Sequence, residues 1–449
     1  MFKEVTISAK WIQNKIVWTL LLIPLCFKVE IISNVIVLPQ EIILPFLIFL
    51  YFFTVRKVKT VISKTVLPYI YLFVAFVLTI IITLFSLLKT FDIVGLLKLI
   101  KYSIYVVSII IIYDYKFPNF IKRINIVSAF TIIFTLFTFY ITKLQSGHTW
   151  STYIAMATYV SEYMPTGFSN RVFNFQSQSF IIYSGNHGIY GSYLALLLFF
   201  NISGIIRGTS NKGLVYIVIF LSFLNIMLLT SRETFLLIVI TLFSFSFYHL
   251  SYMKFNPTKV FIGLVFFIFF IIVLIWAIDF YDIELSIVNK MTNSIRKFKE
   301  EGGDGSVDVR FNTWLIIFIY LFTYPWRLFS GIGFNPTLFR NELDLVAISY
   351  PNIGKYVGIP ESLFIQFLSY GGVLSLLLVI MFMLNLFKNL LKKINTKNGI
   401  FIPFYVLGLS VTNNTGASII AELLMTQFAL IYLFIMNSHG EKKHIIYNR

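Results

Sequence analysis

Long apolar runs alternate with short polar segments along most of the chain. Residues 66–88 and 260–279 contain almost no charged side chains, and about 20 such residues suffice for a helix to cross the hydrocarbon core of a bilayer. The pattern therefore predicts an all-α integral membrane protein, with residues 1–449 as a single polytopic membrane domain. About twelve transmembrane helices are predicted, at roughly 16–38, 39–54, 66–88, 93–113, 123–142, 187–206, 213–230, 232–249, 259–279, 361–387, 399–415 and 419–436.

The composition agrees with this prediction and adds an orientation. Hydrophobic residues make up 58% of the chain and charged residues 12%, against roughly 25% charged residues in soluble domains. More than half of the 36 lysines and arginines fall in segments that the alternation of spans places on one face. Because positively charged loops remain in the cytoplasm, we expect both termini there. The net charge of +17 is thus a topology signal, and no separate basic domain favours a nucleic-acid partner.

Two long segments, 143–186 and 280–360, are predicted to lie on the opposite, periplasmic face. The second contains an apolar stretch, 311–334. If this stretch were a span, the lysine-rich segment 388–397 would move to the outer face, against the charge rule. Pro325, Trp326 and Arg327 also interrupt it. We therefore expect a helix that lies in, or re-enters, the outer leaflet.

Few residues are suited to hold a metal or a disulfide. Cys26 is the only cysteine, and the five histidines are scattered without HxxH or HExxH spacing. A single cysteine cannot form an internal disulfide, and the histidine spacing does not indicate a metal site, so the sequence predicts no cofactor and no metal. No small-residue cleavage site follows the first apolar segment, and we expect that span to be retained.

The segment LLTSRETFLL, residues 228–237, places charges at the start of a predicted span. An arginine there commonly snorkels toward water, and Glu233 is favoured in the first turn of a helix. The alternative for Arg232 is an anion site, because a guanidinium keeps its charge in a low dielectric and matches phosphate oxygens. The sequence leaves both interpretations open.

Further charged residues follow in and after the second outer loop. Arg310, Arg327 and Arg340 could merely solvate the loop. If the loop folds over the start of the Arg232 helix, it would instead gather these cations into a clamp for a diphosphate. Glu361 follows Pro360 at the start of a later span. It either complements the dipole of that helix or serves as a general base toward a sugar hydroxyl.

Lys98 and Lys101 are the main charges inside a predicted span. They lie three residues apart, on one face of the helix. We expect both to snorkel toward water, with contact to a lipid phosphate as the alternative.

Over roughly its C-terminal 280 residues, the chain resembles the superfamily of bacterial O-antigen polymerases and O-antigen ligases. The family has an Asn-containing start of a mid-chain span, a Ser-Arg pair at the start of another, an Arg followed four residues later by Trp, a Pro followed by a Gly-x-Gly turn, and a late span entered by a polar residue and a Gly. The similar segments here are GNHGIYGSYLALLL (185–198), LLTSRETFLL (228–237), VRFNTW (309–314), YPWRLFSGIGF (324–334) and PESLFIQFLSYGGVLSLLL (360–378).

The resemblance implies transfer of a glycan from an undecaprenyl-diphosphate donor, on the periplasmic face of the bacterial inner membrane and without a metal or nucleotide. Arg232 and Arg310 would bind the diphosphate, and Glu361 would be the base for the acceptor hydroxyl. The ligase branch typically has His-Asn where this chain has Glu361-Ser362, so the polymerase branch is favoured. Further residues would contact the diphosphate or the glycan: Arg327, Arg340, Arg171, Asn186 and His187.

Two alternatives remain open at this point. A ligase would move the glycan to the lipid A core. A lipid-linked oligosaccharide flippase would also have about a dozen spans, but it predicts charges distributed through several spans toward a central cavity. In this chain the charges outside the cytoplasmic segments collect at the outer face and in one loop, with Lys98 and Lys101 as the main exceptions inside a span. Expected partners are the lipid-linked oligosaccharide, the bilayer and a chain-length regulator protein.

Overall fold

The computed structural model describes residues 8–22, 29–32, 35–37, 39–55, 64–91, 93–145, 187–206, 212–229, 232–252, 305–351, 353, 360, 362–396, 398–412 and 422–438. For the strands, for 134–145 and for some residues at helix ends, it describes the backbone alone. All structural statements below concern this part of the chain.

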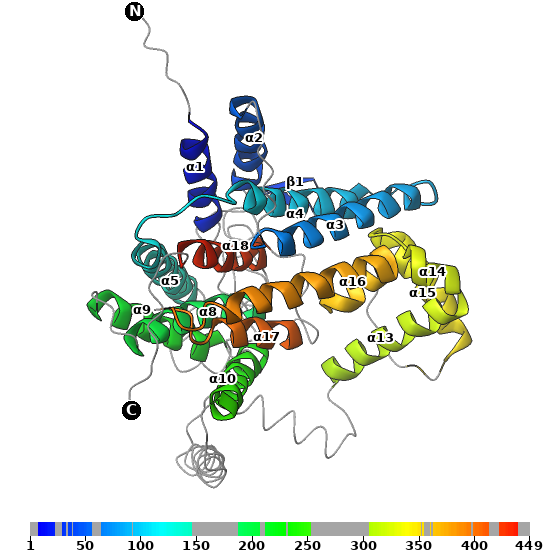
Figure 1. Cartoon of the computed structure of the whole chain (residues 1–449). Helices are drawn as coiled ribbons and strands as arrows, with labels where there is room; N and C mark the ends of the chain where they lie inside the picture. Colours follow the sequence, from blue (N-terminus) through cyan, green and yellow to red (C-terminus); the bar gives the residue numbers. More distant parts are fainter. Residues whose placement is uncertain are drawn as a thin grey trace, which may run out of the picture.

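Helices make up nearly all of the described part (Figure 1). Their bounds are α1 (Ala9–Leu21), α2 (Pro39–Thr54), α3 (Leu67–Ser86), α4 (Ile93–Ile111), α5 (Phe120–Gln145), α8 (His187–Ile206), α9 (Lys212–Leu229), α10 (Arg232–Tyr252), α13 (Gly305–Thr323), α14 (Pro325–Ser330), α15 (Pro336–Ser349), α16 (Leu363–Leu391), α17 (Ile402–Thr412) and α18 (Glu422–Asn437). The strands β1 (Val29–Ile32) and β2 (Val35–Val37) pair as an antiparallel hairpin, with Val29 opposite Val37.

Four helices are long and apolar enough to cross a membrane, judged by length and composition. They are α3, α4, α8 and α16, and shorter apolar helices such as α2, α10 and α13 accompany them. These helices indicate a multi-pass membrane protein, as the hydropathy pattern predicts. The predicted span at 259–279 lies outside the described residues.

The predicted first span, 16–38, is not one helix. Helix α1 ends at Leu21, and residues 29–37 pair as β1 and β2. Hydropathy alone misled the prediction, because this stretch is rich in Val and Ile, which suit a pleated strand as well as a buried helix. Within the predicted second loop, 280–360, the structure has α13, α14 and α15. Helices α13 and α14 fall on the apolar stretch 311–334, where one helix was expected, and Tyr324 separates them.

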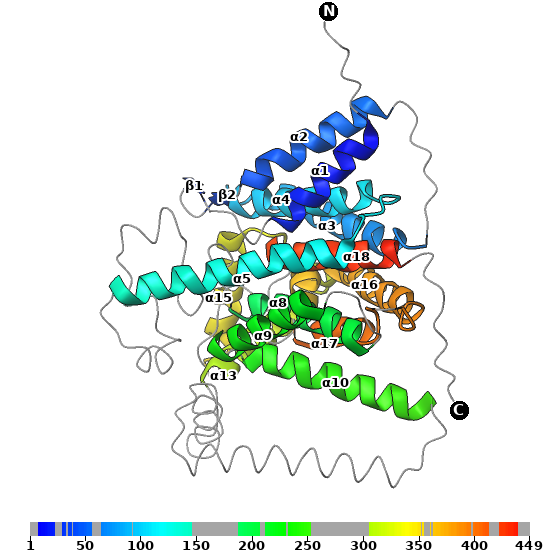
Figure 2. The ribbon, with the colours of Figure 1, turned by 90° about the vertical axis from the view of Figure 1, so that its left-hand side faces the viewer.

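The helices do not form one parallel bundle. In Figure 1, α3, α4 and α16 run lengthwise across the view, whereas Figure 2, turned by 90°, shows α5 and α10 lengthwise. The two groups therefore cross at a large angle. The core between α3, α16 and α18 is aromatic: the ring of Tyr69 packs edge-on against Phe382 and Tyr432, and its hydroxyl donates to the carbonyl of Phe428 at 2.9 Å.

A glycine-rich junction joins the end of α14 to α16 and α3. The amides of Ile332 and Gly333 donate to the carbonyls of Ser369 and Tyr370, at 2.7 and 3.0 Å. Gly372, which has φ +73, interrupts α16. A Cβ on this residue would lie 2.0 Å from the carbonyl oxygen of Phe329, so only glycine fits. The Gly-x-Gly segment and the paired glycines of 371–372 thus meet in space.

Lys101 does not snorkel. Its ammonium lies 2.8 Å from the Glu41 carboxylate, and the hydroxyl of Tyr105 donates to the same oxygen at 2.8 Å. Both charged side chains are well shielded, with 16% and 6% of their surfaces exposed. Pairing replaces the water that Lys101 would otherwise have to reach. Glu41 stands in the first turn of α2, so this pair ties α2 to α4.

Candidate functional site

Helix α13 brings Arg310 to the start of α10. One guanidinium nitrogen of Arg310 lies 3.5 Å from a carboxylate oxygen of Glu233, and Glu233 immediately follows Arg232, the first residue of α10. The side chains of Arg310 and Glu233 keep 28% and 19% of their surfaces exposed. Two arginines that are far apart in the sequence therefore belong to one neighbourhood. For Arg232 the structure describes the backbone only.

The start of α8 lies at the same place. A Cβ added to Gly191 would lie 1.8 Å from the hydroxyl oxygen of Thr234, so the first turns of α8 and α10 are in close contact. Helix α8 begins at His187, of which only the backbone is described. The N-terminal ends of two helices thus meet beside Arg310. The positive ends of the two helix dipoles favour an anion.

Trp314 is one helical turn beyond Arg310 on α13, on the same side of the helix. Its indole nitrogen is buried and has no hydrogen-bond partner among the described residues. Trp314 belongs to the VRFNTW segment, but sequence analysis assigned it no role. A buried donor beside an arginine is suited to an acceptor oxygen of a ligand. The spacing of four residues between Arg310 and Trp314 was the signal in the sequence that could have indicated this role.

Arg327 is not brought to Arg310. Helix α13 continues from Arg310 to Thr323 before α14 begins, which is about 20 Å at roughly 1.5 Å per residue. A diphosphate is only a few ångströms across and cannot reach both side chains. The structure thus divides the loop arginines between the two ends of α13 instead of gathering them in one clamp.

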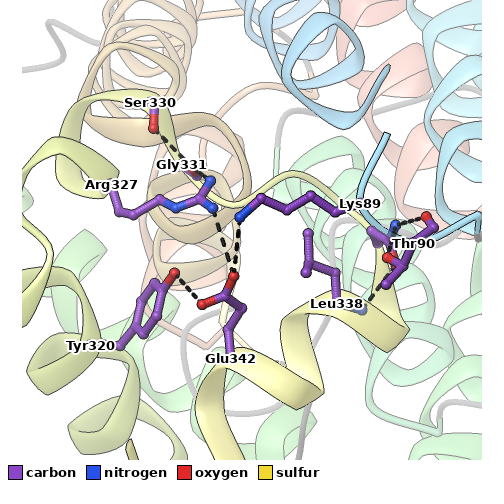
Figure 3. Close-up of polar contacts among 9 residues, drawn as sticks. Lys89, Thr90, Tyr320, Arg327, Ser330, Gly331, Leu338 and Glu342 are labelled. Carbon is purple, nitrogen blue, oxygen red and sulfur yellow. Dashed lines mark hydrogen bonds and ion pairs between the residues drawn. The ribbon is translucent and has the colours of Figure 1, made fainter. Parts of the chain in front are cut away.

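At its own end of α13, Arg327 belongs to a second group of polar side chains around Glu342 (Figure 3). The Glu342 carboxylate accepts a hydrogen bond from the Tyr320 hydroxyl at 3.0 Å, and it lies 3.7 Å from the Arg327 guanidinium and 3.6 Å from the Lys89 ammonium. We call Lys89, Tyr320, Arg327 and Glu342 the Glu342 cluster. It joins the segment after α3 to α13, α14 and α15.

The side chain of Arg327 is buried by its own neighbours. It donates to the carbonyl of Gly331 at 3.1 Å, and its guanidinium lies 3.9 Å from the ring centroid of Trp326. Arg340 is different: its side chain is 76% exposed and lies 4.0 Å from Asp344, one turn further on α15. Arg340 therefore has the features of a surface arginine.

The remaining predicted site residues, Glu361, Arg171 and Asn186, lie outside the described residues. The neighbours of Glu361 are described. Ser362 caps α16 by accepting from the Ile365 amide at 3.4 Å, and the Gln366 side chain donates to the Pro360 carbonyl at 2.7 Å. Helix α16 begins at Leu363, directly after this cap.

No group of three or more His, Cys, Asp or Glu side chains suited to a metal occurs within the described ranges. Comparison of the chain with protein-family models, with curated proteins and with solved structures finds no match. The chemistry of the candidate site therefore rests on Arg232, Arg310 and their surroundings.

Proposed function

We propose that this chain is a surface-polysaccharide polymerase of the bacterial inner membrane, acting on its periplasmic face. It transfers a glycan from undecaprenyl diphosphate to the non-reducing end of a lipid-linked repeat unit. The observation that carries the proposal is the contact of Arg310 with Glu233, because it brings Arg310 to the start of α10, the helix that begins at Arg232.

The arrangement suits a reaction in which a diphosphate leaves. The acceptor hydroxyl oxygen forms a bond to the anomeric carbon of the donor, the bond from that carbon to the diphosphate oxygen breaks, and the hydroxyl proton passes to a base. Negative charge grows on the leaving diphosphate. Arg232, Arg310 and the helix starts offer preorganised positive charge for it, and Glu361 is our candidate for the base.

Glu233 balances part of this charge when no substrate is bound. The distance of 3.5 Å to Arg310 exceeds the roughly 2.7 to 2.9 Å of a tight charge-assisted hydrogen bond. In this proposal the incoming diphosphate replaces Glu233 as the partner of Arg310.

The alternatives are a ligase that acts on the lipid A core and a flippase. The charge of Lys101 inside α4 does not favour the flippase. Lys101 forms an ion pair with Glu41 of α2 and so does not offer its charge to an anionic cargo. A chain-length regulator protein is a further proposed partner. Neither a metal nor a nucleic acid enters this proposal.

Complementation tests the proposal. In a strain that lacks this protein, the native chain should restore a ladder of polysaccharide chains on a gel. R232A, R310A and E361A should leave a single repeat on the lipid core, at equal protein levels in the membrane. R340A is the matched control and should keep the ladder, since Arg340 is an exposed arginine away from α10.

Each other outcome identifies a different function. An unchanged ladder with R232A and R310A would overturn the assignment of the site. Long lipid-linked chains that never reach the lipid core would indicate a ligase. Repeat units that stay on the cytoplasmic face would indicate a flippase.

A further inference from the structure

Helix α13 and the following α14 carry an apolar stripe that no described residue covers. On α13 it repeats at intervals of three and four residues, the spacing of one helical face, and two further members lie on α14, after the non-helical Tyr324. The exposed members include Phe322 and Phe329, each with 71% of its surface exposed. The apolar stripe consists of Phe311, Leu315, Phe318, Phe322, Trp326 and Phe329. Such a surface is suited to hydrocarbon chains and not to water.

The Glu342 cluster lies at one end of this stripe. Trp326 of the stripe contacts the cluster: its ring is 56% exposed, and the Arg327 guanidinium lies against it at 3.9 Å. Lys89, in the segment that follows α3, approaches the Glu342 carboxylate, as Figure 3 shows. Tryptophan beside cations is the residue combination found at the boundary between lipid chains and headgroups.

The charges of the Glu342 cluster do not balance. Lys89 and Arg327 are two cations, and among the described residues Glu342 is the one carboxylate that forms an ion pair with both. The two ion pairs, at 3.6 and 3.7 Å, are longer than tight charge-assisted hydrogen bonds. The Lys89 side chain is 55% exposed, and the Arg327 Nε is buried without a hydrogen-bond partner among the described residues. One positive charge is thus left for an external anion.

We propose that the Glu342 cluster binds the phosphodiester of an anionic bilayer phospholipid, whose acyl chains lie along the apolar stripe. Lys89 contacts the phosphate directly, and Arg327 adds positive charge from behind it. The cluster and the stripe match the two parts of such a lipid. The cations of the cluster suit the headgroup, and the aromatic side chains of the stripe suit the hydrocarbon.

This lipid site is separate from the proposed diphosphate site. The length of α13 between Arg310 and its end is about 20 Å, so one phosphate group cannot occupy both. The phospholipid site therefore does not require that the chain is a polymerase. Phospholipid bound here would hold the junction of α13 and α14 at the level of the headgroups.

The test uses the full chain in nanodiscs of phosphatidylcholine with a minor fraction of phosphatidylglycerol. Lipids that stay bound after mild detergent extraction are counted by native mass spectrometry. The unaltered protein should retain phosphatidylglycerol in excess over its share of the bilayer. K89Q should lower this enrichment about fivefold, the size expected for one lysine near anionic lipid. R340Q, which also removes one exposed cation from this region, should leave it unchanged.

A second measurement needs no variant. Raising the salt concentration should lower the enrichment in the unaltered protein, because ions screen an exposed lysine. Equal enrichment in K89Q and the unaltered protein, or an enrichment that salt does not change, would overturn the proposal. So would displacement of phosphatidylglycerol by a stoichiometric amount of polyprenyl diphosphate, because the cluster would then belong to a substrate.

Discussion

Arg310 on α13 and Glu233 on α10 form an ion pair of 3.5 Å that neither helix could form alone. Arg310 is the only charged residue of α13 whose side chain the structure describes. Its contact with Glu233 places it where α10 begins. The pair joins the two segments that sequence analysis singled out for a diphosphate. Its strength decides whether loss of Arg310 would affect folding or chemistry.

We expect the Arg310–Glu233 pair to contribute little to stability. Both side chains keep some exposure, and pairs of this kind contribute about 0.2–1 kcal/mol. A double-mutant cycle with R310A and E233Q, measured by thermal unfolding in detergent, should give a coupling free energy in this range. A coupling of several kcal/mol would mean that the pair holds α13 in place, and that a loss of polymer in R310A reflects folding.

Arg327 should contribute to stability and not to turnover. R327A removes the hydrogen bond to Gly331, the ring contact with Trp326 and one cation beside Glu342. We expect a loss of about 1–3 kcal/mol in thermal unfolding. R340A should change stability by less than about 0.5 kcal/mol, as for most surface substitutions. Equal losses of stability in R327A and R340A would contradict the difference in burial between Arg327 and Arg340.

Gly372 should not tolerate a side chain. Its φ of +73 is costly for other residues, by about 1–3 kcal/mol, and the added Cβ would meet the Phe329 carbonyl. G372A should therefore lower both the melting temperature and the amount of protein in the membrane. Gly213 is the matched control, because a Cβ there meets nothing within 4 Å. G213A in the first turn of α9 should be neutral or slightly stabilising.

Lys101 and Glu41 should depend on each other. K101M leaves a shielded carboxylate without its ammonium, for which we expect a loss of about 3 kcal/mol or more. The double variant K101M/E41Q removes both charges and should be more stable than K101M alone. Thermal unfolding of the single and double variants measures this. If the effects simply add, Lys101 interacts mainly with water or lipid, as the sequence suggested.

Much of the fold could be predicted from the sequence, because hydropathy is a local property. Uninterrupted apolar runs determine α3, α4, α8 and α16 as helices long enough for a bilayer, since backbone amides in lipid must be paired within the segment. The same rule failed at 29–37, where β-branched residues pair as a hairpin. Local hydropathy cannot distinguish a buried strand from a short buried helix.

The sequence by itself thus determined most of the apolar helices and indicated which arginines are suited to bind an anion. Only the tertiary structure decided which charges meet: Arg310 with Glu233, Lys101 with Glu41, and Arg327 with Glu342 at the far end of α13. The physical reason is that each of these pairs joins residues on different helices. Their approach depends on how the helices pack and not on the residues next to each charge in the chain. Near Arg327, glycine contacts let α14 and α16 come together.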